Sequence, residues 1–326
     1  MPKAIGGFFE LELQRGHHLY PRATGFNSAR SAFQALLTTT KVRRVHLPFY
    51  ICDVMGAALG SAGVEVVHYA LSEDFELLES PALESDETLL YVNYFGLKGT
   101  YLRDTLAPLF GQQLTVDNSQ GLFSKPLPGV ATIYSPRKFV GVPDGGWLVN
   151  GPDNCSPLEP NSSQDRFAAL LGRLEDAPRN HYARFQALEE ALAQEGVRAM
   201  SQSTARILDS IDYPQVAHRR IDNLAMLHKH LAPFNRFDAW PETTAAALCY
   251  PLLLDTAERA ATLRTQLAQQ QIYVPCYWYE VARAPFVPAI EKNWANCLLP
   301  LPIDQRYGVN EMNRLVDALL PHLITI

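Results

Sequence analysis

The sequence is poor in cysteine and has no clustered metal ligands. Its 326 residues include five cysteines, which are widely spaced, odd in number and without a C-x-x-C pair. This pattern suggests neither a disulfide framework nor a zinc motif. The nine histidines form close pairs only at 17–18 and 228–230, with no acidic residue at metal-ligand spacing. We therefore expect no metal site and a reducing, cytoplasmic setting.

Basic runs and long apolar runs are also missing. The chain has 28 lysines and arginines against 34 acidic residues, a net charge of −6, which argues against nucleic-acid binding. No apolar stretch reaches the ~20 residues that cross a bilayer, and the N-terminus lacks a signal-peptide pattern, so no membrane partner is expected. With 47% hydrophobic and 19% charged residues, the chain reads as an ordinary globular protein long enough for two domains.

Two nucleotide-binding motifs are absent, although the first half has the pattern of an α/β protein. Residues 44–63 read as a strand, a turn and a helix, 64–71 and 87–97 as strands, and 103–113 as a helix. This alternation predicts a mainly parallel sheet covered by helices. No G-x-G-x-x-G follows the first strand and no G-x-x-x-x-G-K-[ST] occurs, so dinucleotide and P-loop functions lose their main support.

The stretch 114–149 carries the most chemistry. The apolar run LTV predicts a buried strand that ends at Asp117, and VATIY predicts another that ends at Ser135, with Lys138 one turn later. GGWLV (145–149) predicts a third strand after a glycine turn. Open α/β sheets bind ligands at the carboxyl ends of their strands. We therefore expect Asp117, Ser135 and Lys138 to lie near one site.

An aspartate, a serine and a lysine suit pyridoxal phosphate (PLP). The lysine forms a Schiff base, the aspartate keeps the pyridinium nitrogen protonated, and the serine helps to bind the phosphate. Ser135 and Lys138 also have the S-x-x-K form of penicillin-binding proteins, whose serine is a nucleophile. Neither an S-D-N nor a K-T-G element follows, and that interpretation leaves Asp117 unexplained. A solvated loop lysine is the remaining alternative.

These motifs resemble the DegT/DnrJ family of PLP-dependent sugar aminotransferases. In that family an Asp is followed three residues later by His or Gln, as Asp117 is by Gln120, and a Ser precedes the Schiff-base Lys, as Ser135 precedes Lys138. A glycine pair then opens the next strand. The resemblance implies PLP fold type I: a mainly parallel, seven-stranded-type central sheet covered by helices, with a small C-terminal α+β domain. It also implies that Gln120 lies near the cofactor's O3′.

A capped helix predicted over 26–39 would supply the phosphate site. A helix N-terminus is a ready anion site, and Ser28, Ala29 and Arg30 are similar to the family's phosphate-binding element. The side chain of Arg30 or Arg137 would help. A further family element carries the aromatic ring that stacks on the pyridine. The matching position here is Cys52, so Tyr50 or Tyr94 would supply that ring.

The remaining sequence divides the chain into three parts. We expect an N-terminal arm at 1–20, a large PLP-binding domain at 21–234 and a small α+β domain at 235–326. The large domain would end in helices over 166–176, 180–196 and 219–234. The small domain would hold strands over 243–255, 272–278 and 295–303 and helices over 256–270 and 309–323.

The resemblance implies an aminotransferase. It would move an amino group from an amino acid, with glutamate as the expected donor, to a keto sugar linked to a nucleotide, for surface polysaccharides or secondary metabolites. Family members are homodimers with shared sites, but the usual cross-dimer Asn has no counterpart here. Two alternatives stay open: another PLP reaction, such as a dehydratase or lyase, and a non-catalytic relative that acts as a scaffold.

Overall fold

Seven strands form the central sheet of the structure, a computed structural model that describes residues 5–157, 159–237 and 244–324. In chain order they are β1 (Thr24–Phe26), β2 (Arg44–Pro48), β3 (Glu65–Tyr69), β4 (Glu87–Val92), β5 (Leu114–Asn118), β6 (Ala131–Tyr134) and β7 (Gly146–Val149). Their order across the sheet is β1-β7-β6-β5-β4-β2-β3, and only β7 runs antiparallel to its neighbours. The predicted mainly parallel sheet is confirmed.

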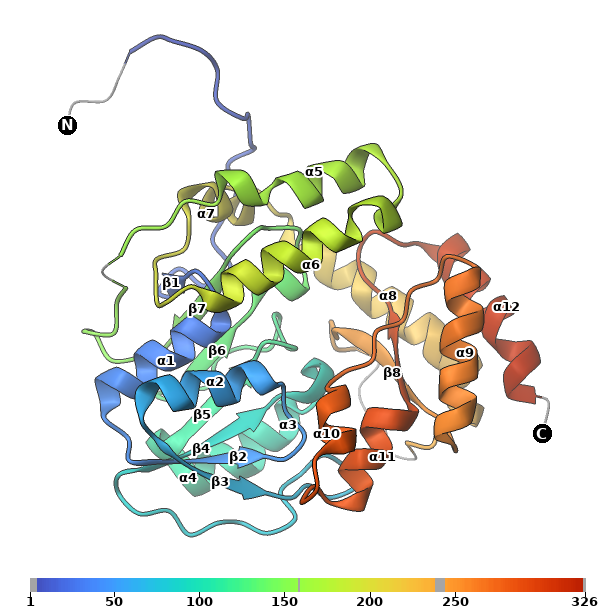
Figure 1. The fold of residues 1–326 in the computed structure, drawn as a ribbon, viewed down its shortest axis with the longest axis horizontal. Coiled ribbons are helices and arrows are strands. Elements are labelled where there is room, and N and C mark those ends of the chain that lie inside the picture. The colour runs from blue at the N-terminus through green and yellow to red at the C-terminus, as the bar shows by residue number, and fades with distance from the viewer. Residues whose placement is uncertain (1–4, 158, 238–243, 325–326) are drawn as a thin grey trace.

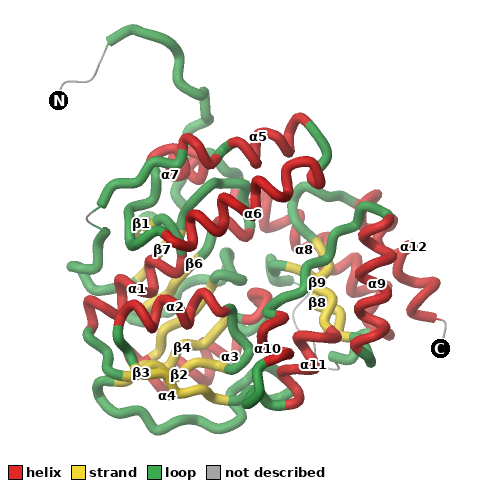
Figure 2. Tube along the Cα trace, viewed as in Figure 1, coloured by secondary structure: helices red, strands yellow, loops and turns green. Residues whose placement is uncertain are grey.

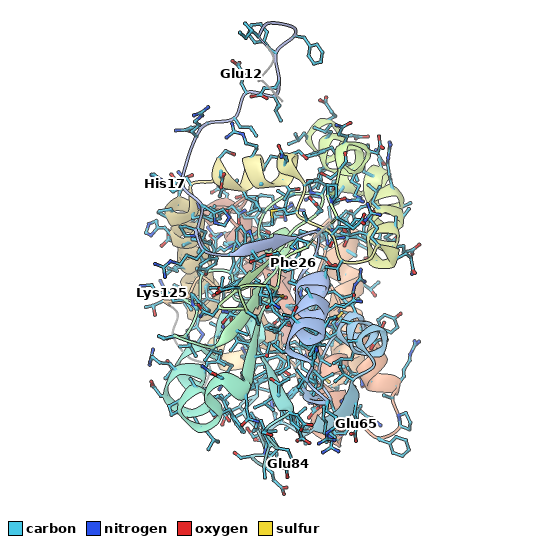
Figure 3. All side chains as sticks on the ribbon, turned by 90° about the vertical axis from the view of Figure 1, so that its left-hand side faces the viewer. Glu12, His17, Phe26, Glu65, Glu84 and Lys125 are labelled. Atoms are coloured by element: carbon cyan, nitrogen blue, oxygen red, sulfur yellow. The ribbon has the colours of Figure 1, made fainter. Side chains whose placement is uncertain are left out.

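Helices cover both faces of this sheet. Helices α1 (Ala29–Thr40) and α2 (Asp53–Ala62) pack together on one face, and the helical stretch 99–113, with α3 (Gly99–Tyr101) and α4 (Ala107–Phe110), covers the other (Figures 1 and 3). Every residue of β4 and β5 is buried. Strands covered on both faces favour apolar side chains, as in the middle of β4, whereas the polar residues of β4 and β5 lie mainly at the strand ends.

Four helices follow the sheet. They are α5 (Ala168–Glu175), α6 (Pro178–Gln194), α7 (Gln202–Asp209) and α8 (Tyr213–Leu231). Helix α8 begins earlier than the predicted 219–234, because the Asp212 side chain accepts a hydrogen bond from the Gln215 amide and Pro214 occupies the first turn. An N-cap acceptor and an early proline both favour a helix start. Among the described residues, no helix is long and apolar enough to cross a membrane.

The C-terminal part packs beside the large sheet. It contains β8 (Cys249–Leu253), α9 (Ala257–Gln269), α10 (Tyr279–Arg283), α11 (Ala289–Cys297), β9 (Leu298–Pro302) and α12 (Val309–Ile324). Strands β8 and β9 pair antiparallel. The predicted strand over 243–255 is shorter, 249–253, and its first residue lies outside the described residues.

The strand predicted over 272–278 is wrong, because this segment is a loop (Figure 2). Pro275 has no amide hydrogen for a ladder, and Trp278 has a φ of +55°, in the left-handed region. The Trp278 ring instead packs edge-on against Tyr50, with ring centroids 4.6 Å apart. The apolar character of the segment therefore reflects aromatic packing and not strand pairing.

The N-terminal arm leaves the body without forming a helix or strand over residues 5–19 (Figures 2 and 3). Phe8 and Phe9 are 99% and 92% exposed. Glu12 lies on the arm, whereas Phe26 of β1 lies inside the body (Figure 3). The apolar side chains at the outer part of the arm are thus exposed, whereas Leu19, at its inner end, packs against a buried cluster of the body.

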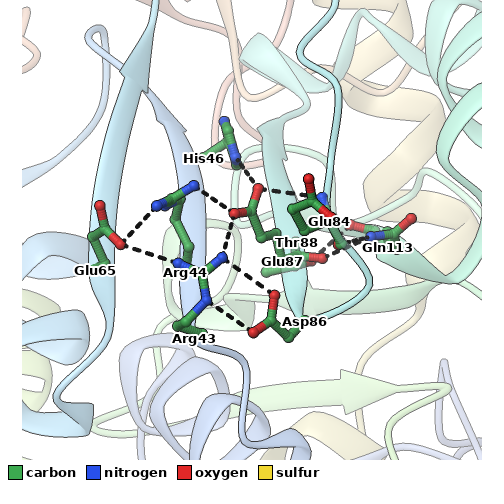
Figure 4. Close-up of polar contacts among 9 residues, drawn as sticks. All are labelled: Arg43, Arg44, His46, Glu65, Glu84, Asp86, Glu87, Thr88 and Gln113. Atoms are coloured by element: carbon green, nitrogen blue, oxygen red, sulfur yellow. Dashed lines mark hydrogen bonds and ion pairs between the residues drawn. The ribbon is translucent and has the colours of Figure 1, made fainter.

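An ion-pair network joins the amino ends of β2 and β4 (Figure 4). Glu87, whose side chain is 1% exposed, accepts from Arg44 Nη1 at 2.5 Å, Arg43 Nη2 at 2.9 Å and His46 Nε2 at 2.9 Å. The hydrogen bond from His46 is the main cause of the lowered pKa of Glu87. Because these partners of Glu87 lie in β2 or directly before it, we assign this network to the assembly of the strands.

Candidate active site

Asp117 lies at the carboxyl end of β5, beside β6. In the parallel register Asp117 pairs with Ile133, and Ser135 follows two residues later. The Asp117 side chain is buried, and its Oδ1 accepts a hydrogen bond of 2.8 Å from the Ser119 amide. Its Oδ2 has no donor among the described residues. A carboxylate oxygen that no protein group engages is available to accept a hydrogen bond from a ligand.

Lys138 presents its amine to solvent. It ends a 3-10 turn over Pro136–Lys138, and its amide donates to the Ser135 carbonyl at 3.2 Å. The lysine is exposed, whereas the next residue, Phe139, is buried. The ammonium makes no ion pair with any residue that the structure describes. The sheet thus places an accessible amine one turn beyond the strand that neighbours Asp117.

Asp144, which the sequence analysis did not identify, anchors the loop after Lys138. It is fully buried and bound by α7 and the preceding loop. Oδ2 accepts from the Ser201 amide at 2.9 Å and from Asn161 Nδ2 at 2.6 Å. Oδ1 accepts from Ser201 Oγ at 2.8 Å and from the Thr204 hydroxyl. The only signal in the sequence was a carboxylate beside the glycine pair, since its partners lie 17 to 60 residues away.

The glycine pair brings the start of α1 to this edge. Gly145 has a φ of +125°, and its amide donates to the Asn27 carbonyl at 2.8 Å. A Cβ on Gly146 would lie 2.2 Å from the carbonyl carbon of Ser28. The close approach therefore requires glycine at Gly146, and the conformation of Gly145 favours it.

Ser28 caps α1. Its Oγ accepts from the Ser31 amide at 3.0 Å, which is the expected N-cap contact. Ala29 and Arg30 form the first turn of the helix, directly above the glycine pair. The first turn of a helix offers partial positive charge to an anion.

Two arginines add full positive charge to this edge. Arg30 Nη2 donates to the Leu192 carbonyl at 2.9 Å, and Arg137 donates to Glu189, so both reach α6. Burial and the nearby charge of Arg137 lower the pKa of Arg30. The buried Nε of Arg137 has no partner in the described part of the chain. An anion placed between them would stabilise both guanidinium groups.

The remaining predicted site residues differ in exposure. Gln120 is buried, and its Oε1 accepts from the Phe95 amide at 2.7 Å. Tyr50 and Tyr94 are fully buried, with ring centroids 5.9 Å apart and a 2.8 Å bond from the Tyr94 hydroxyl to the Tyr50 carbonyl. Cys52, at the start of α2, is partly exposed. Of these four residues, only Cys52 is partly exposed, and the other three are buried.

No group of three or more His, Cys, Asp or Glu side chains suited to a metal ion occurs in residues 5–157, 159–237 and 244–324. The groups that the described residues bring to this edge are the Asp117 carboxylate, the accessible Lys138 amine and the start of α1 with Arg30 and Arg137.

Comparison with known proteins identifies the fold. No family model and no curated protein matches the chain. Solved structures, in contrast, do match the chain. Spr1654 of Streptococcus pneumoniae in its PLP form has a TM-score of 0.67 at 13% identity, covering 94% of this chain and 88% of that one. A DegT DnrJ EryC1 StrS aminotransferase from Brucella abortus has a TM-score of 0.64 at 13% identity, covering 95% and 92%. DesI, solved in the presence of its TDP-sugar product, has a TM-score of 0.64 at 17% identity, covering 94% and 81%.

These likenesses extend over nearly the whole chain, so it has the fold of the PLP-dependent transferases of fold type I, as predicted. At these identities they show the fold, and the activity has to be argued from the site.

Proposed function

We propose that the chain is a PLP-dependent aminotransferase of the DegT/DnrJ type. It would move an amino group from an amino acid, glutamate as the expected donor, to a nucleotide-linked keto sugar. The observation that carries this proposal is the buried Asp117 carboxylate beside the strand that leads to the accessible Lys138 amine. The PLP form of Spr1654 and the TDP-sugar product of DesI support the cofactor and the substrate class.

The residues present fit the cofactor. Asp117 Oδ2 accepts no hydrogen bond from the described residues, so it is free to accept one from a protonated ring nitrogen. The start of α1, with Ser28, Ala29 and Arg30, and the unpaired Nε of Arg137 fit a phosphate. Ser135 lies at the end of β6, on the way to Lys138, and would add a hydroxyl. Gln120 would lie near O3′. Of the three candidates to border the ring, Cys52 is favoured, because Tyr50 and Tyr94 are fully buried whereas Cys52 is partly exposed.

Each residue then has a definite task. Bound PLP supplies an electron sink for charge that develops on the carbon bearing the amine. The Asp117 carboxylate would hold the proton on the ring nitrogen, an interaction that the burial of Asp117 strengthens because the local dielectric is low. Lys138 would hold the cofactor covalently, and its amine would move the proton at the reacting carbon.

The organisation of the whole protein belongs to the same proposal. We assign residues 1–20 to an arm, 21–234 to the PLP-binding domain and 235–326 to the small domain. The active unit would be a cytoplasmic homodimer, and its product an amino sugar for surface polysaccharides or secondary metabolites. The exposed arm supports the dimer, because its apolar side chains need a surface to cover them.

The test is the attachment of the cofactor to Lys138. We expect purified protein to gain a visible absorption band with PLP, and borohydride to fix the label on the Lys138 peptide. Lys138→Ala should abolish both the label and multiple turnover with glutamate and a nucleotide-linked keto sugar. Lys125→Ala, at another exposed lysine, should change neither.

The outcomes separate the alternatives. A label on another lysine would remove the assignment of Lys138. Absence of any band would favour a scaffold that does not bind PLP. A band without amino transfer, together with loss of water from a sugar or an amino acid, would favour a dehydratase or lyase.

A further inference from the structure

Two side chains from distant parts of the chain, Arg220 and Gln305, contact Phe139, the residue that follows Lys138. Gln305 Nε2 donates to the Phe139 carbonyl at 2.7 Å. The guanidinium carbon of Arg220 lies 4.5 Å from the centre of the Phe139 ring. Arg220 Nε also donates to Gln305 Oε1 at 3.1 Å, so the two side chains support each other. One contact holds the backbone of Phe139 and the other holds its ring.

Arg220 is itself fixed by the segment that enters β8. It is 1% exposed, and its Nη1 donates to the carbonyls of Ala247 and Leu248 at 3.1 and 3.2 Å. Burial lowers its pKa to about 10, whereas the charge of Asp304 acts in the opposite direction. A buried guanidinium bound mainly to carbonyl dipoles is stable only while those partners stay in place. A shift of residues 247–248 would therefore displace Arg220 and change its contact with the Phe139 ring.

The same segment reaches the other side of the candidate site. The Leu248 amide donates to the Phe95 carbonyl at 2.9 Å, and the Phe95 amide donates to Gln120 Oε1 at 2.7 Å. Phe95 has a φ of +57°, a conformation that L-residues rarely adopt. A continuous chain of contacts thus runs from Gln120, three residues beyond Asp117, to the neighbour of Lys138 (Figure 1 shows these elements).

We propose that Arg220 and Gln305 are positioning residues that set the place of Lys138 relative to Asp117 according to the placement of the C-terminal part of the chain. The role of Lys138 in this inference rests on the proposed function. We call these contacts of Arg220 and Gln305 with Phe139 the clamp. It acts on Lys138 through Phe139, because Phe139 is the next residue in the chain and is held at both its backbone and its ring. A change in the C-terminal part, such as one produced by a bound substrate, is then transmitted to the reactive amine.

Gln305 offers a sharp test, because its two contacts use different atoms. Gln305→Glu keeps an acceptor for Arg220 but has no N–H for the Phe139 carbonyl. Gln112→Glu makes the same chemical change at an exposed position and serves as the control. Arg220→Lys keeps the positive charge but replaces the several N–H donors of the guanidinium group by one ammonium. If this variant fails to fold, the comparison of Gln305→Glu with Gln112→Glu still tests the proposal.

The first readout is amide hydrogen exchange of residues 136–142 in cofactor-free protein. In the wild type the amides of Phe139 and Val140 both donate to the Pro136 carbonyl at 2.9 Å. We expect Gln305→Glu to speed their exchange about tenfold, the amount that loss of roughly one hydrogen bond allows. Exchange in α9 and the melting temperature should stay close to those of Gln112→Glu.

The second readout is catalytic. In loaded enzyme, Gln305→Glu should lower kcat and leave KM for the amino donor nearly unchanged. Unchanged exchange at 136–142, or an equal increase in α9, would overturn the clamp. Because the exchange measurement needs no cofactor, a protein that fails to bind PLP would remove the proposed function and still leave the clamp to be judged by exchange.

Discussion

At the scale of single residues, Asp117 makes the most specific claim. Its Oδ1 is used by the Ser119 amide, whereas its Oδ2 accepts no hydrogen bond from the described residues, and the residue is only 5% exposed. A carboxylate in this state stabilises a positive charge placed next to it far more than an exposed one would. The electron-sink chemistry proposed here depends on that charge, because a neutral ring nitrogen withdraws electrons less strongly.

We therefore predict that Asp117→Asn lowers transamination by on the order of 10²-fold or more while the protein still binds PLP. The amide oxygen can still accept from Ser119, so the melting temperature should change little. Steady-state kinetics and the visible band measure the two effects. Asp74→Asn, an exposed substitution of the same kind, is the control. Near-normal turnover in Asp117→Asn would reduce the aspartate to a cap at the strand end.

Some site residues could be predicted from sequence and others could not. Asp117 and Lys138 follow apolar runs directly, and a strand end carries its own side chains to the edge of the sheet. Asp144, Arg220 and Gln305 depend on partners brought close only by the complete fold: Gln305 is 85 residues from Arg220 and 166 from Phe139. Local patterns hold no information on such contacts, so these residues were missed.

At the scale of elements, the packing of α1 on β7 holds the anion site in place. Gly146 lies in contact with the backbone at Ser28 and Ala29, with no room for a side-chain atom. Asp144 holds the preceding turn against α7 from the other side. The start of α1 is thus positioned by backbone contact and not by an adjustable side chain.

We predict that Gly146→Ala moves the start of α1 and weakens phosphate binding. The added Cβ would meet backbone atoms that cannot rotate away, so the free energy of unfolding should fall by about 2 kcal/mol or more. Gly56→Ala is the matched control, since a Cβ there meets nothing within 4 Å inside α2 and should stabilise by ~0.5–1 kcal/mol. Urea unfolding gives the stabilities, and calorimetry with inorganic phosphate gives the anion affinity. Equal stabilities for the two variants would contradict the contact.

The elements themselves were predicted unevenly. The strands of the parallel sheet appear close to their expected positions, because burial on both faces leaves a simple apolar run with polar ends. The segment 272–278 has the same apolar character but packs as aromatic loop, and α10 and α11 after it were not expected. Composition measures burial, and it does not distinguish a paired strand from a loop that packs its rings into the core.

At the scale of the whole molecule, Glu291 of α11 joins the C-terminal part to the central sheet. It is fully buried, and its Oε1 accepts from the Leu71 amide, just after β3, at 2.8 Å. Its Oε2 has no partner among the residues described. Burial raises the pKa of Glu291 to about 7. The bond between the two parts is therefore compatible with a protonated carboxyl near neutral pH.

This pKa predicts that stability falls as pH rises. Below about pH 4.5 the group is protonated in both the folded and the unfolded chain, and between pH 4.5 and 7 only the folded chain keeps the proton. Its contribution should be lost through this window, by about 3 kcal/mol in total. Glu291→Gln should lack this slope and exceed the wild type in stability at pH 8, measured by urea unfolding at several pH values. Glu79→Gln, at an exposed site, should keep the wild-type slope; a parallel slope in Glu291→Gln would refute the argument.

The association state is the last property that the whole chain decides. Two aromatic segments bear on it, Phe8-Phe9 and Tyr277-Trp278-Tyr279, and they differ in the structure. Trp278 packs on Tyr50 inside the protein, whereas Phe8 and Phe9 stand on the arm with 99% and 92% of their surface exposed. Exposed apolar patches commonly mark interaction surfaces. The arm therefore becomes the part of the chain that a partner copy would bury.

We predict a homodimer whose arms reach across the two-fold axis. Light scattering on the PLP-loaded protein should give twice the chain mass of 36.4 kDa at micromolar concentration. Replacing Phe8 and Phe9 together by alanine should shift the equilibrium towards monomer, because such interfaces commonly bury ~2,000 Å² or more and depend on a few large anchors. Leu174→Ala, at a side chain 83% exposed on α5, controls for lost apolar surface elsewhere. A fully active protein of single-chain mass would contradict a shared site, and an unchanged dimer in the double variant would place the interface away from the arm.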